Sequence, residues 1–152
     1  MADSHAAKRL GYASGVPPAV VAAWPEAKAH IQRVECVAVI IMMVLMAPLI
    51  SHRNVLWFCD NSSVLGALVK GRSNDPVVHV LGQLMALFLF RINAIVWWEF
   101  VESEANWSDG VSRKGSGCAW AKRHNFTVQD VVMPALAAGT VAEAIVQLRS
   151  LS

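Results

Sequence analysis

The stretch VLWFCDNSS, residues Val55–Ser63, joins an apolar run directly to a polar one. Five consecutive apolar residues predict a short strand that is buried on both faces, as in a parallel sheet. Asp60, Asn61 and Ser62 are residue types that cap the N-terminus of a helix. We therefore expect a buried strand that ends at Cys59 and passes at once into a helix.

Helices are expected on both sides of this strand. Before it, Pro25 can open a helix over Glu26–Ala47, because the first helical position needs no N–H donor. After it, Val64–Lys70 predicts a short helix and Pro76–Arg91 a longer one that opens with a first-turn proline. A second strand, rich in aromatic and branched residues, is expected over Ala94–Val101. Strands joined by helical crossovers predict an α/β fold with parallel pairing.

The two ends of the chain differ from this central pattern. Residues 1–25 are rich in glycine and proline and predict short strands and turns. A short helix is expected near Trp107–Ser112, and Gly115–Gly117 predicts a linker. Beyond it, Thr127–Asp130 and Thr140–Glu143 each resemble a capping box, so two short helices are expected outside the main sheet.

The composition of the chain is typical of a globular domain and excludes several other classes of protein. The chain has 152 residues, of which 55% are hydrophobic and 16% charged, and its net charge is +2. We expect one domain with a real core, and the small charge does not mark a strongly basic nucleic-acid binder. Three scattered cysteines favour a reducing compartment over a disulfide framework or a zinc finger. Val37–Ile50 carries no charge but is shorter than the about 20 residues of a membrane span, so a buried helix is expected and a small membrane protein is an alternative.

Three acidic residues occupy positions where a negative charge is expected to be unfavourable. Glu35 lies inside an apolar helix, where burial of a lone carboxylate is unfavourable. Asp60 ends the central strand and Asp109 opens a helix after the next one, so both fall on the edge where α/β sheets bind ligands. Converging carboxylates repel one another, and divalent cations such as Mg²⁺ or Mn²⁺ would remove that repulsion. The alternatives are a helix cap at Asp60, a helix-dipole contact at Asp109 and an exposed helix stripe at Glu35.

These acidic residues lie in segments that resemble a known family, the ribonuclease H domain of retroelement reverse transcriptases. The resemblance covers about residues 3–113. Its most specific parts are the strand that ends in Asp-Asn and the pattern Ser-x-x-Asn-x-x-Asp-x-x-Ser-Arg. The segments are Ile31–Glu35, Trp57–Ser63, Leu68–Gly71 and Val101–Arg113.

The resemblance implies a fold and a metal site. The fold would be a ribonuclease H-like mixed β-sheet of five strands flanked by helices over residues 1–113, followed by a linker and a short helical tail over residues 114–152. The first strand would be shortened, because only two residues precede Asp3. Four carboxylates would hold two Mg²⁺ or Mn²⁺ ions, and the matching catalytic residues are Asp3, Glu35, Asp60 and Asp109, with Asp60 bridging both ions.

The resemblance also implies an activity and a substrate. The family cuts the RNA strand of RNA–DNA hybrids with two metal ions, which activate a water and stabilise the leaving 3′ oxygen. Hybrids are recognised by shape and 2′-hydroxyl contacts rather than by base edges. The residues expected to contact nucleic acid are Asn61, Ser62, Lys70, Arg72, Arg113 and Lys114. For the four basic residues the alternative is an ordinary solvated face.

The leading hypothesis is therefore a metal-dependent endonuclease that acts inside the cell as part or remnant of a reverse transcriptase polyprotein, with no membrane partner. The main alternative is a catalytically inactive remnant that binds nucleic acid or serves as a structural module. The first carboxylate, Asp3, distinguishes the two, because without it the metal site is incomplete. A related nuclease or integrase with the same sheet is a further alternative.

Overall fold

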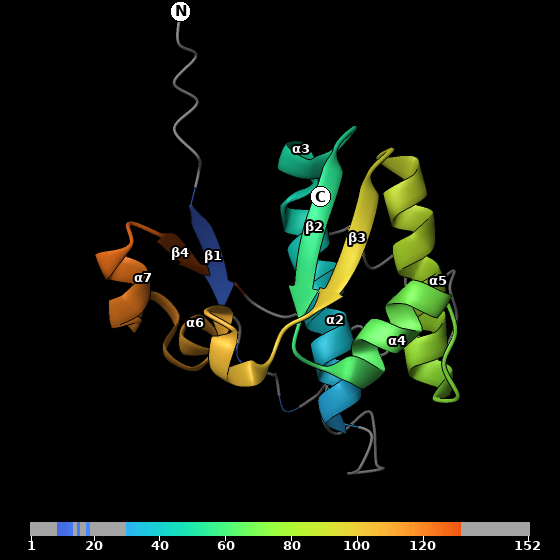
Figure 1. Ribbon diagram of the computed structural model, residues 1–152, viewed down its shortest axis with the longest axis horizontal. Helices are drawn as coiled ribbons and strands as arrows, with labels where there is room; N and C mark the ends of the chain where they lie inside the picture. The colour runs from blue at the N-terminus through green and yellow to red at the C-terminus, as the bar shows by residue number, and fades with distance from the viewer. Residues whose placement is uncertain (1–8, 14, 16–17, 19–29, 132–152) are drawn as a thin grey trace, which may run out of the picture. The chain divides into compact units, whose positions relative to one another are not determined.

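The computed structural model describes residues 9–13, 15, 18 and 30–131 (Figure 1). These residues fall into two compact units. The large unit comprises residues 18 and 30–102, and the small unit comprises residues 9–13, 15 and 103–131. Each unit carries its own pair of parallel strands. Asp3, the predicted start of the first helix and the helix predicted at Thr140–Glu143 lie outside the described residues.

The large unit packs a pair of strands against helices. In chain order its elements are α2 (His30–Leu45), α3 (Ala47–Ile50), β2 (Asn54–Cys59), α4 (Ser62–Lys70), α5 (Pro76–Arg91) and β3 (Ile95–Phe100). β2 and β3 are parallel, with Val55 opposite Val96 and Trp57 opposite Trp98. The predicted strands, the helical crossover between them and their parallel pairing are thereby confirmed.

Local signals explain where the crossover helices begin and end. Asp75 caps α5, because its Oδ1 accepts hydrogen bonds from the N–H groups of Val77 (2.9 Å) and Val78 (3.0 Å). Pro76 follows in the first turn, where its missing N–H is not needed. α4 ends at Gly71, whose φ of +63° is a conformation that glycine adopts without strain.

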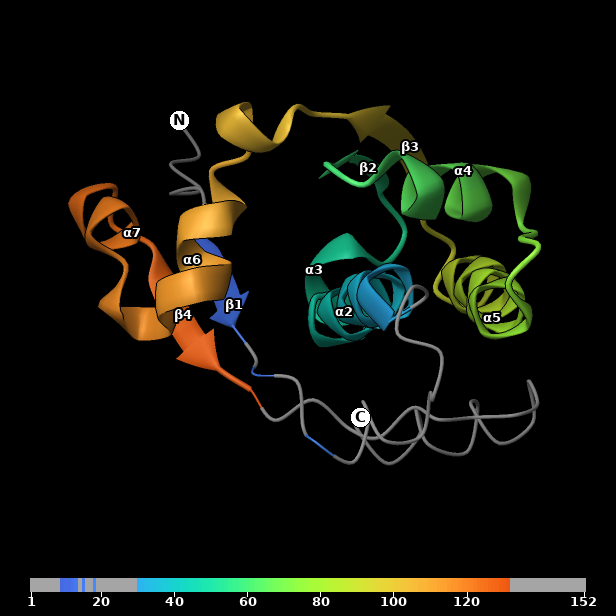
Figure 2. The same cartoon turned by 90° about the horizontal axis from the view of Figure 1, so that it is seen from below.

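The core of the large unit lies on one face of its sheet. Figure 2 shows α2 and α5 side by side along that face, and Ile40 and Met43 of α2 are fully buried there. Leu56, Phe58 and Trp97 point to the other face and keep 57%, 56% and 68% of their surface exposed. The prediction of a strand buried on both faces is therefore wrong, because α2 and α5 cover only one of them.

An ion pair links α2 to the start of α5. Arg33, which is only 7% exposed, donates hydrogen bonds to Oδ2 of Asp75 from Nε (2.9 Å) and Nη2 (2.7 Å). Burial would raise the pKa of Asp75, but the hydrogen bonds from Arg33 and from the Val78 N–H outweigh burial and lower this pKa. The pair holds α2, which carries Glu35, in place against α5.

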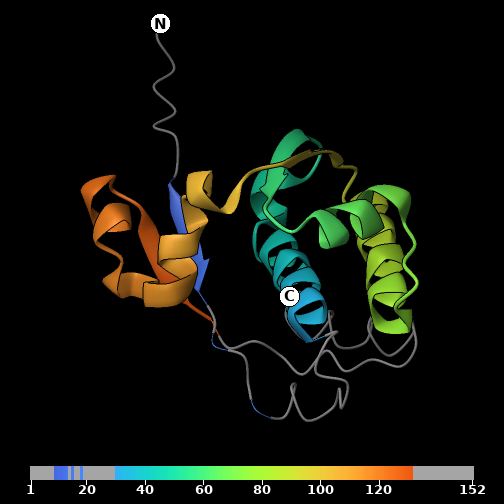
Figure 3. The same cartoon turned by 60° about the horizontal axis from the view of Figure 1, so that its bottom comes forward.

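The small unit joins two distant parts of the chain. Its elements are β1 (Leu10–Ala13), the 3₁₀ helix η2 (Ser103–Ala105), α6 (Ser108–Lys114), the 3₁₀ helix η3 (Gly115–Gly117), α7 (Ala119–Arg123) and β4 (Thr127–Asp130). β1 and β4 are parallel, with Leu10 opposite Thr127 and Ala13 opposite Asp130. Figure 3 shows α6 lying against β1. The buried core of this unit is Ala13, Val111, Cys118 and Ala121.

Part of the predicted tail is corrected in this unit. Thr127–Asp130 forms strand β4, so its interpretation as the start of a helix is wrong. The reason is pairing with a distant segment, because Val128 lies opposite Gly11 of β1. Gly11 has no side chain, which permits the close approach: a Cβ there would lie 3.2 Å from the Val128 side chain. The predicted linker Gly115–Gly117 is a 3₁₀ helix, and the predicted boundary at residues 113–114 falls inside the small unit.

The described residues thus form an α/β protein with small parallel sheets. Two separate two-stranded sheets are present among them, so the single mixed sheet implied by the resemblance is not confirmed. Within the described part of the chain, no helix combines the length and the apolar character that crossing a membrane requires.

Candidate functional site

Three polar residues meet at the carboxyl end of β2. Asp60 directly follows the last residue of the strand, and Asn61 comes next. The side-chain amide of Asn61 donates a hydrogen bond from Nδ2 to Oε2 of Glu35, which is carried by α2. Asp60 is close enough for its negative charge to act on Glu35. The structure thus brings together Glu35 and Asp60, two of the four predicted carboxylates.

The charged form of Glu35 is unfavourable in this place. Glu35 is half-buried, and this burial raises its pKa above the ordinary value. The hydrogen bond from Asn61 lowers the pKa and the charge of Asp60 raises it, so the net shift is upward. A cation beside both groups would favour the ionised form of Glu35. The chemistry of these oxygen donors therefore fits a hard divalent cation such as Mg²⁺.

Asn61 is oriented by the start of α4. Its Oδ1 accepts hydrogen bonds from the N–H groups of Ser63 (2.9 Å) and Val64 (3.0 Å), which caps the helix. The amide nitrogen is thereby directed toward Glu35. An aspartate here would cap the helix equally well but has no donor for the Glu35 carboxylate. Asn61, predicted to contact nucleic acid, is thus also a helix cap that positions Glu35.

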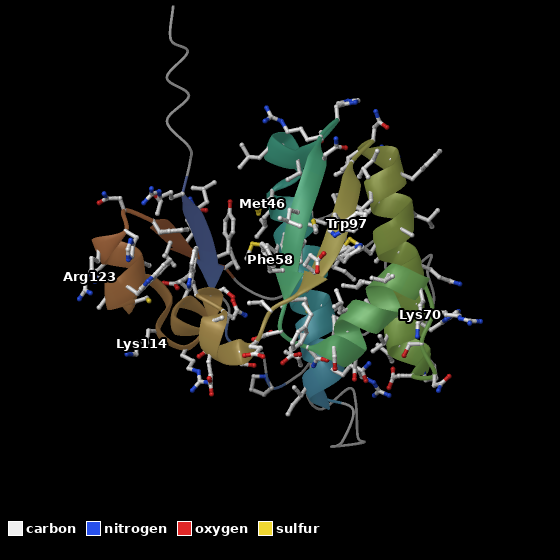
Figure 4. The ribbon with its side chains drawn as sticks, viewed as in Figure 1. Met46, Phe58, Lys70, Trp97, Lys114 and Arg123 are labelled. Carbon is white, nitrogen blue, oxygen red and sulfur yellow. The ribbon has the colours of Figure 1, made fainter. Side chains whose placement is uncertain are left out.

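A groove of about 550 Å³ lies along α4, beginning next to Asn61. Lys70 lies at the far end of the same helix, as Figure 4 shows. Hydroxyl, amide and cationic groups line this groove, and these are the groups that contact phosphates in nucleic-acid complexes. The lining residues are Ser62, Ser63, Gly66, Ala67, Lys70, Arg72, Ser73 and Asn74. Three of the predicted nucleic-acid contacts, Ser62, Lys70 and Arg72, therefore share one surface.

The spacing of small residues along the sequence indicates part of this groove, although no family motif does. Ser62 and Gly66 are four residues apart, so two small residues lie on one face of the helix. Ser63 and Ala67 repeat this spacing one residue later. Ser73 and Asn74 carry no such signal, because the loop after α4 brings them to the groove.

The other predicted site residues of the described chain lie in the small unit. Asp109 is in the first turn of α6, and its Oδ1 accepts a hydrogen bond from Nε of Arg113 at 2.9 Å. Lys114 ends the same helix and is exposed (Figure 4). Oδ1 of Asn106 accepts a hydrogen bond from the Ser108 N–H at 3.1 Å, which accounts for a helix beginning where the sequence predicts one. Among the residues that the structure describes, no three acidic, histidine or cysteine side chains are grouped to hold a metal ion.

Comparisons of the chain with protein-family models, with curated proteins and with solved structures found no match. The likeness to ribonuclease H domains therefore stays a prediction from the sequence motifs. The physical basis for a functional interpretation is the pair of carboxylates at the end of β2 and the groove beside them.

Proposed function

We propose that the chain is a ribonuclease H-type endonuclease that hydrolyses the RNA strand of RNA–DNA hybrids. It would act inside the cell as part or remnant of a retroelement reverse transcriptase, with the mixed sheet of that family as its fold. One observation carries the proposal: Glu35 and Asp60 come together at the carboxyl end of a parallel strand, next to a groove lined by hydroxyl and cationic groups. Open α/β sheets bind their ligands at this edge.

Each described residue of the site has a distinct task in this proposal. Glu35 and Asp60 would hold divalent cations, and the resemblance assigns the same task to Asp109 and Asp3. Asn61 would position the Glu35 carboxylate through its hydrogen bond and would link the acidic site to the groove along α4. Lys70 and Arg72 would hold phosphates of the hybrid, and so would Arg113 and Lys114.

The residues present fit the proposed metal in donor type. Two Mg²⁺ or Mn²⁺ ions would supply, when bound, the charge that activates a water and stabilises the leaving oxygen. The raised pKa of Glu35 makes this carboxylate sensitive to a neighbouring cation. Addition of Mg²⁺ should therefore raise the melting temperature, because a ligand that binds only the folded chain stabilises it.

A second candidate is a catalytically inactive remnant that binds nucleic acid or serves as a structural module. It is favoured by the partners that two of the carboxylates already have. Glu35 accepts a hydrogen bond from Asn61, and Asp109 accepts one from Arg113. In this case the groove along α4 would bind nucleic acid without any cleavage.

Cleavage of a labelled RNA–DNA hybrid in Mg²⁺ or Mn²⁺ tests the proposal. We expect the chain to cut only the RNA strand, and Asp60→Asn to lower the rate on the order of 10³-fold or more. The matched control is Glu99→Gln, which removes an exposed carboxylate from β3 that pairs with the Trp97 indole. This control should cut at the rate of the unchanged chain.

Two outcomes would contradict the proposed activity. The first is cleavage that Asp60→Asn leaves intact, since the activity would then belong to another site or to a contaminant. The second is a folded chain that binds the hybrid and cuts neither strand, which would establish the inactive remnant.

A further inference from the structure

Four aromatic rings form a cluster in the small unit. Trp120 of α7 lies at its centre, with ring centroids 5.6 Å from Trp107, 4.5 Å from His124 and 5.3 Å from Phe126. The rings are tilted by 33–42° to one another, an offset arrangement that aromatic pairs favour. Trp107 precedes α6, while the other three rings come from α7 and the turn after it. The cluster is therefore a product of the tertiary structure.

The outer end of this cluster is open. Trp107 keeps 71% of its surface exposed, although it packs against Trp120. Trp120 and Phe126 rest on the core of the small unit and are only half-buried. Packing against the core explains why Trp120 and Phe126 are large and apolar. It does not explain Trp107, because most of the surface of this side chain stays exposed.

Cations flank the rings. Arg9 donates a hydrogen bond from Nη1 to the carbonyl oxygen of His124 at 2.8 Å, so its guanidinium lies beside that residue. Arg123 is exposed at the end of α7 (Figure 4). It lies three residues after Trp120, and side chains at this spacing are neighbours on a helix surface. The described residues of the small unit include five basic and three acidic side chains. The cluster therefore combines ring faces with positive charge.

We propose that this aromatic cluster, Trp107 with Trp120, His124 and Phe126, is a binding site for single-stranded nucleic acid. An unpaired base would stack on the exposed ring of Trp107, and Arg9 and Arg123 would hold the adjoining phosphates. Ring faces beside cations are how proteins bind single strands without reading their sequence, because every base has a stacking face and every nucleotide a phosphate. This binding of single strands needs no metal and is a different activity from the proposed cleavage of hybrids, although Trp107 lies only two residues before Asp109.

The surroundings of Trp107 favour nucleic acid over an apolar partner. Trp107 is the one large hydrophobic side chain with high exposure among the described residues of the small unit. A membrane surface or an apolar protein groove would call for a wider apolar patch. A single exposed ring, in a cluster that has Arg9 and Arg123 near its other members, instead suits a planar base attached to an anionic backbone.

Binding of a fluorescent single-stranded oligothymidine to the whole chain tests the site, measured by anisotropy in EDTA so that no cleavage occurs. We expect Trp107→Ala to weaken binding about tenfold and Trp107→Phe to retain most of it, because the ring is what stacks. Arg123→Ala should lower the slope of log K against log salt by about 0.7, since one phosphate contact is lost.

Two matched controls come from the large unit. Trp97→Ala removes a tryptophan of similar exposure, 68%, and Arg91→Ala removes an exposed arginine from the end of α5. Both should bind as the unchanged chain does. Equal weakening by Trp97→Ala, or unchanged binding by Trp107→Ala, would overturn the site. Binding to phosphatidylserine vesicles that needs Trp107, without binding to the oligonucleotide, would overturn it in favour of a membrane contact.

Loss of hybrid cleavage and loss of single-strand binding are separable results. Asp60→Asn should abolish the first and leave the second unchanged. Trp107→Ala should weaken the second while thermal unfolding followed by circular dichroism shows that the chain stays folded.

Discussion

The two units of the chain build the same element, a pair of parallel strands, in different ways. In the large unit, β2 and β3 have six residues each and are joined by the α4–α5 crossover. In the small unit, β1 and β4 have four residues each and come from opposite ends of the described chain. Among the described residues, the buried core of the large unit has fifteen members and that of the small unit has four. Because stabilisation grows with buried apolar area, the small unit depends more on its turns and close contacts.

The two units also expose different surfaces. Nine of the ten large hydrophobic side chains that are exposed among the described residues belong to the large unit. Several of them, such as Leu56 and Trp97, lie on the open face of its sheet. In its described residues the small unit exposes one such side chain, Trp107, and Arg9 contacts the backbone of His124 in the same aromatic cluster. An exposed tryptophan in the large unit thus belongs to a wider apolar sheet face, whereas Trp107 in the small unit belongs to an aromatic cluster with basic neighbours.

The largest effect should come from the buried ion pair of the large unit. Asp75→Ala removes the α5 cap and the carboxylate that faces the buried Arg33, and it should cost about 3–5 kcal/mol of stability. Hydrogen exchange should rise in α2 and α5 and stay unchanged in α6 and α7. Because the pKa of Asp75 is lowered in the folded state, its contribution is present above pH 3.8 and is lost as the pH falls through the folded pKa.

The matched control for this pair is Asp109→Ala. It breaks the exposed ion pair with Arg113 in the small unit, and such pairs are worth at most about 0.5–1 kcal/mol. Equal loss of protection in both units after Asp75→Ala would contradict the division into two units.

Two glycines with positive φ separate backbone strain from tertiary contact. Gly115 has φ +52°, and a Cβ there would lie 2.6 Å from Oδ1 of Asp130. Gly71 has φ +63° with no atom within 4 Å of the same position. We expect Gly71→Ala to cost about 1 kcal/mol and Gly115→Ala about 2–3 kcal/mol, measured by urea unfolding. Equal losses in the free energy of unfolding would show that β4 moves enough to accommodate the added Cβ.

Glu35→Gln should stabilise the chain at neutral pH while abolishing the proposed activity. The pKa of Glu35 is raised, so the stability linked to its protonated form is present below pH 4.5 and is lost as the pH rises through the folded pKa. The substitution removes the carboxylate whose charged form is unfavourable there, so thermal unfolding at pH 7 should shift to a higher temperature. Active sites often trade stability for function in this way. Melting temperatures of both proteins across pH 4–8 measure the difference. A Glu35→Gln variant that is less stable than the unchanged chain at pH 7 would contradict this expectation.

The smallest effect concerns the open face of the large sheet. Trp97→Ala should change stability by no more than about 0.5 kcal/mol, because the side chain is 68% exposed. Trp57→Ala, on the face that packs against the helices, should cost about 3 kcal/mol. Denaturant unfolding of both variants compares the faces directly. A large loss from Trp97→Ala would mean that this face is covered in the folded chain.

The candidate site could be predicted in part. Local sequence is enough to predict two of its residues, because Asp60 directly follows an apolar run and Glu35 is an isolated carboxylate in an apolar helix. The hydrogen bond between Glu35 and Asn61 was not predictable, because it depends on how α2 packs beside the end of β2. Ser73 and Asn74 escaped prediction for the same reason, since only the loop conformation brings them to the groove.

Local sequence is sufficient to predict β2, β3 and the crossover helices. The signals are apolar runs, Asp75-Pro76 and Gly71, and each acts within a few residues of the element that it specifies. Tertiary structure alone decided that Thr127–Asp130 pairs with β1 as a strand, although its local pattern resembles a helix start. It also decided which strand face stays open and which rings gather around Trp120. These features depend on contacts between residues far apart in the chain. Such contacts depend on the entropy of closing long loops and on packing, and neither produces a periodic pattern in the local sequence.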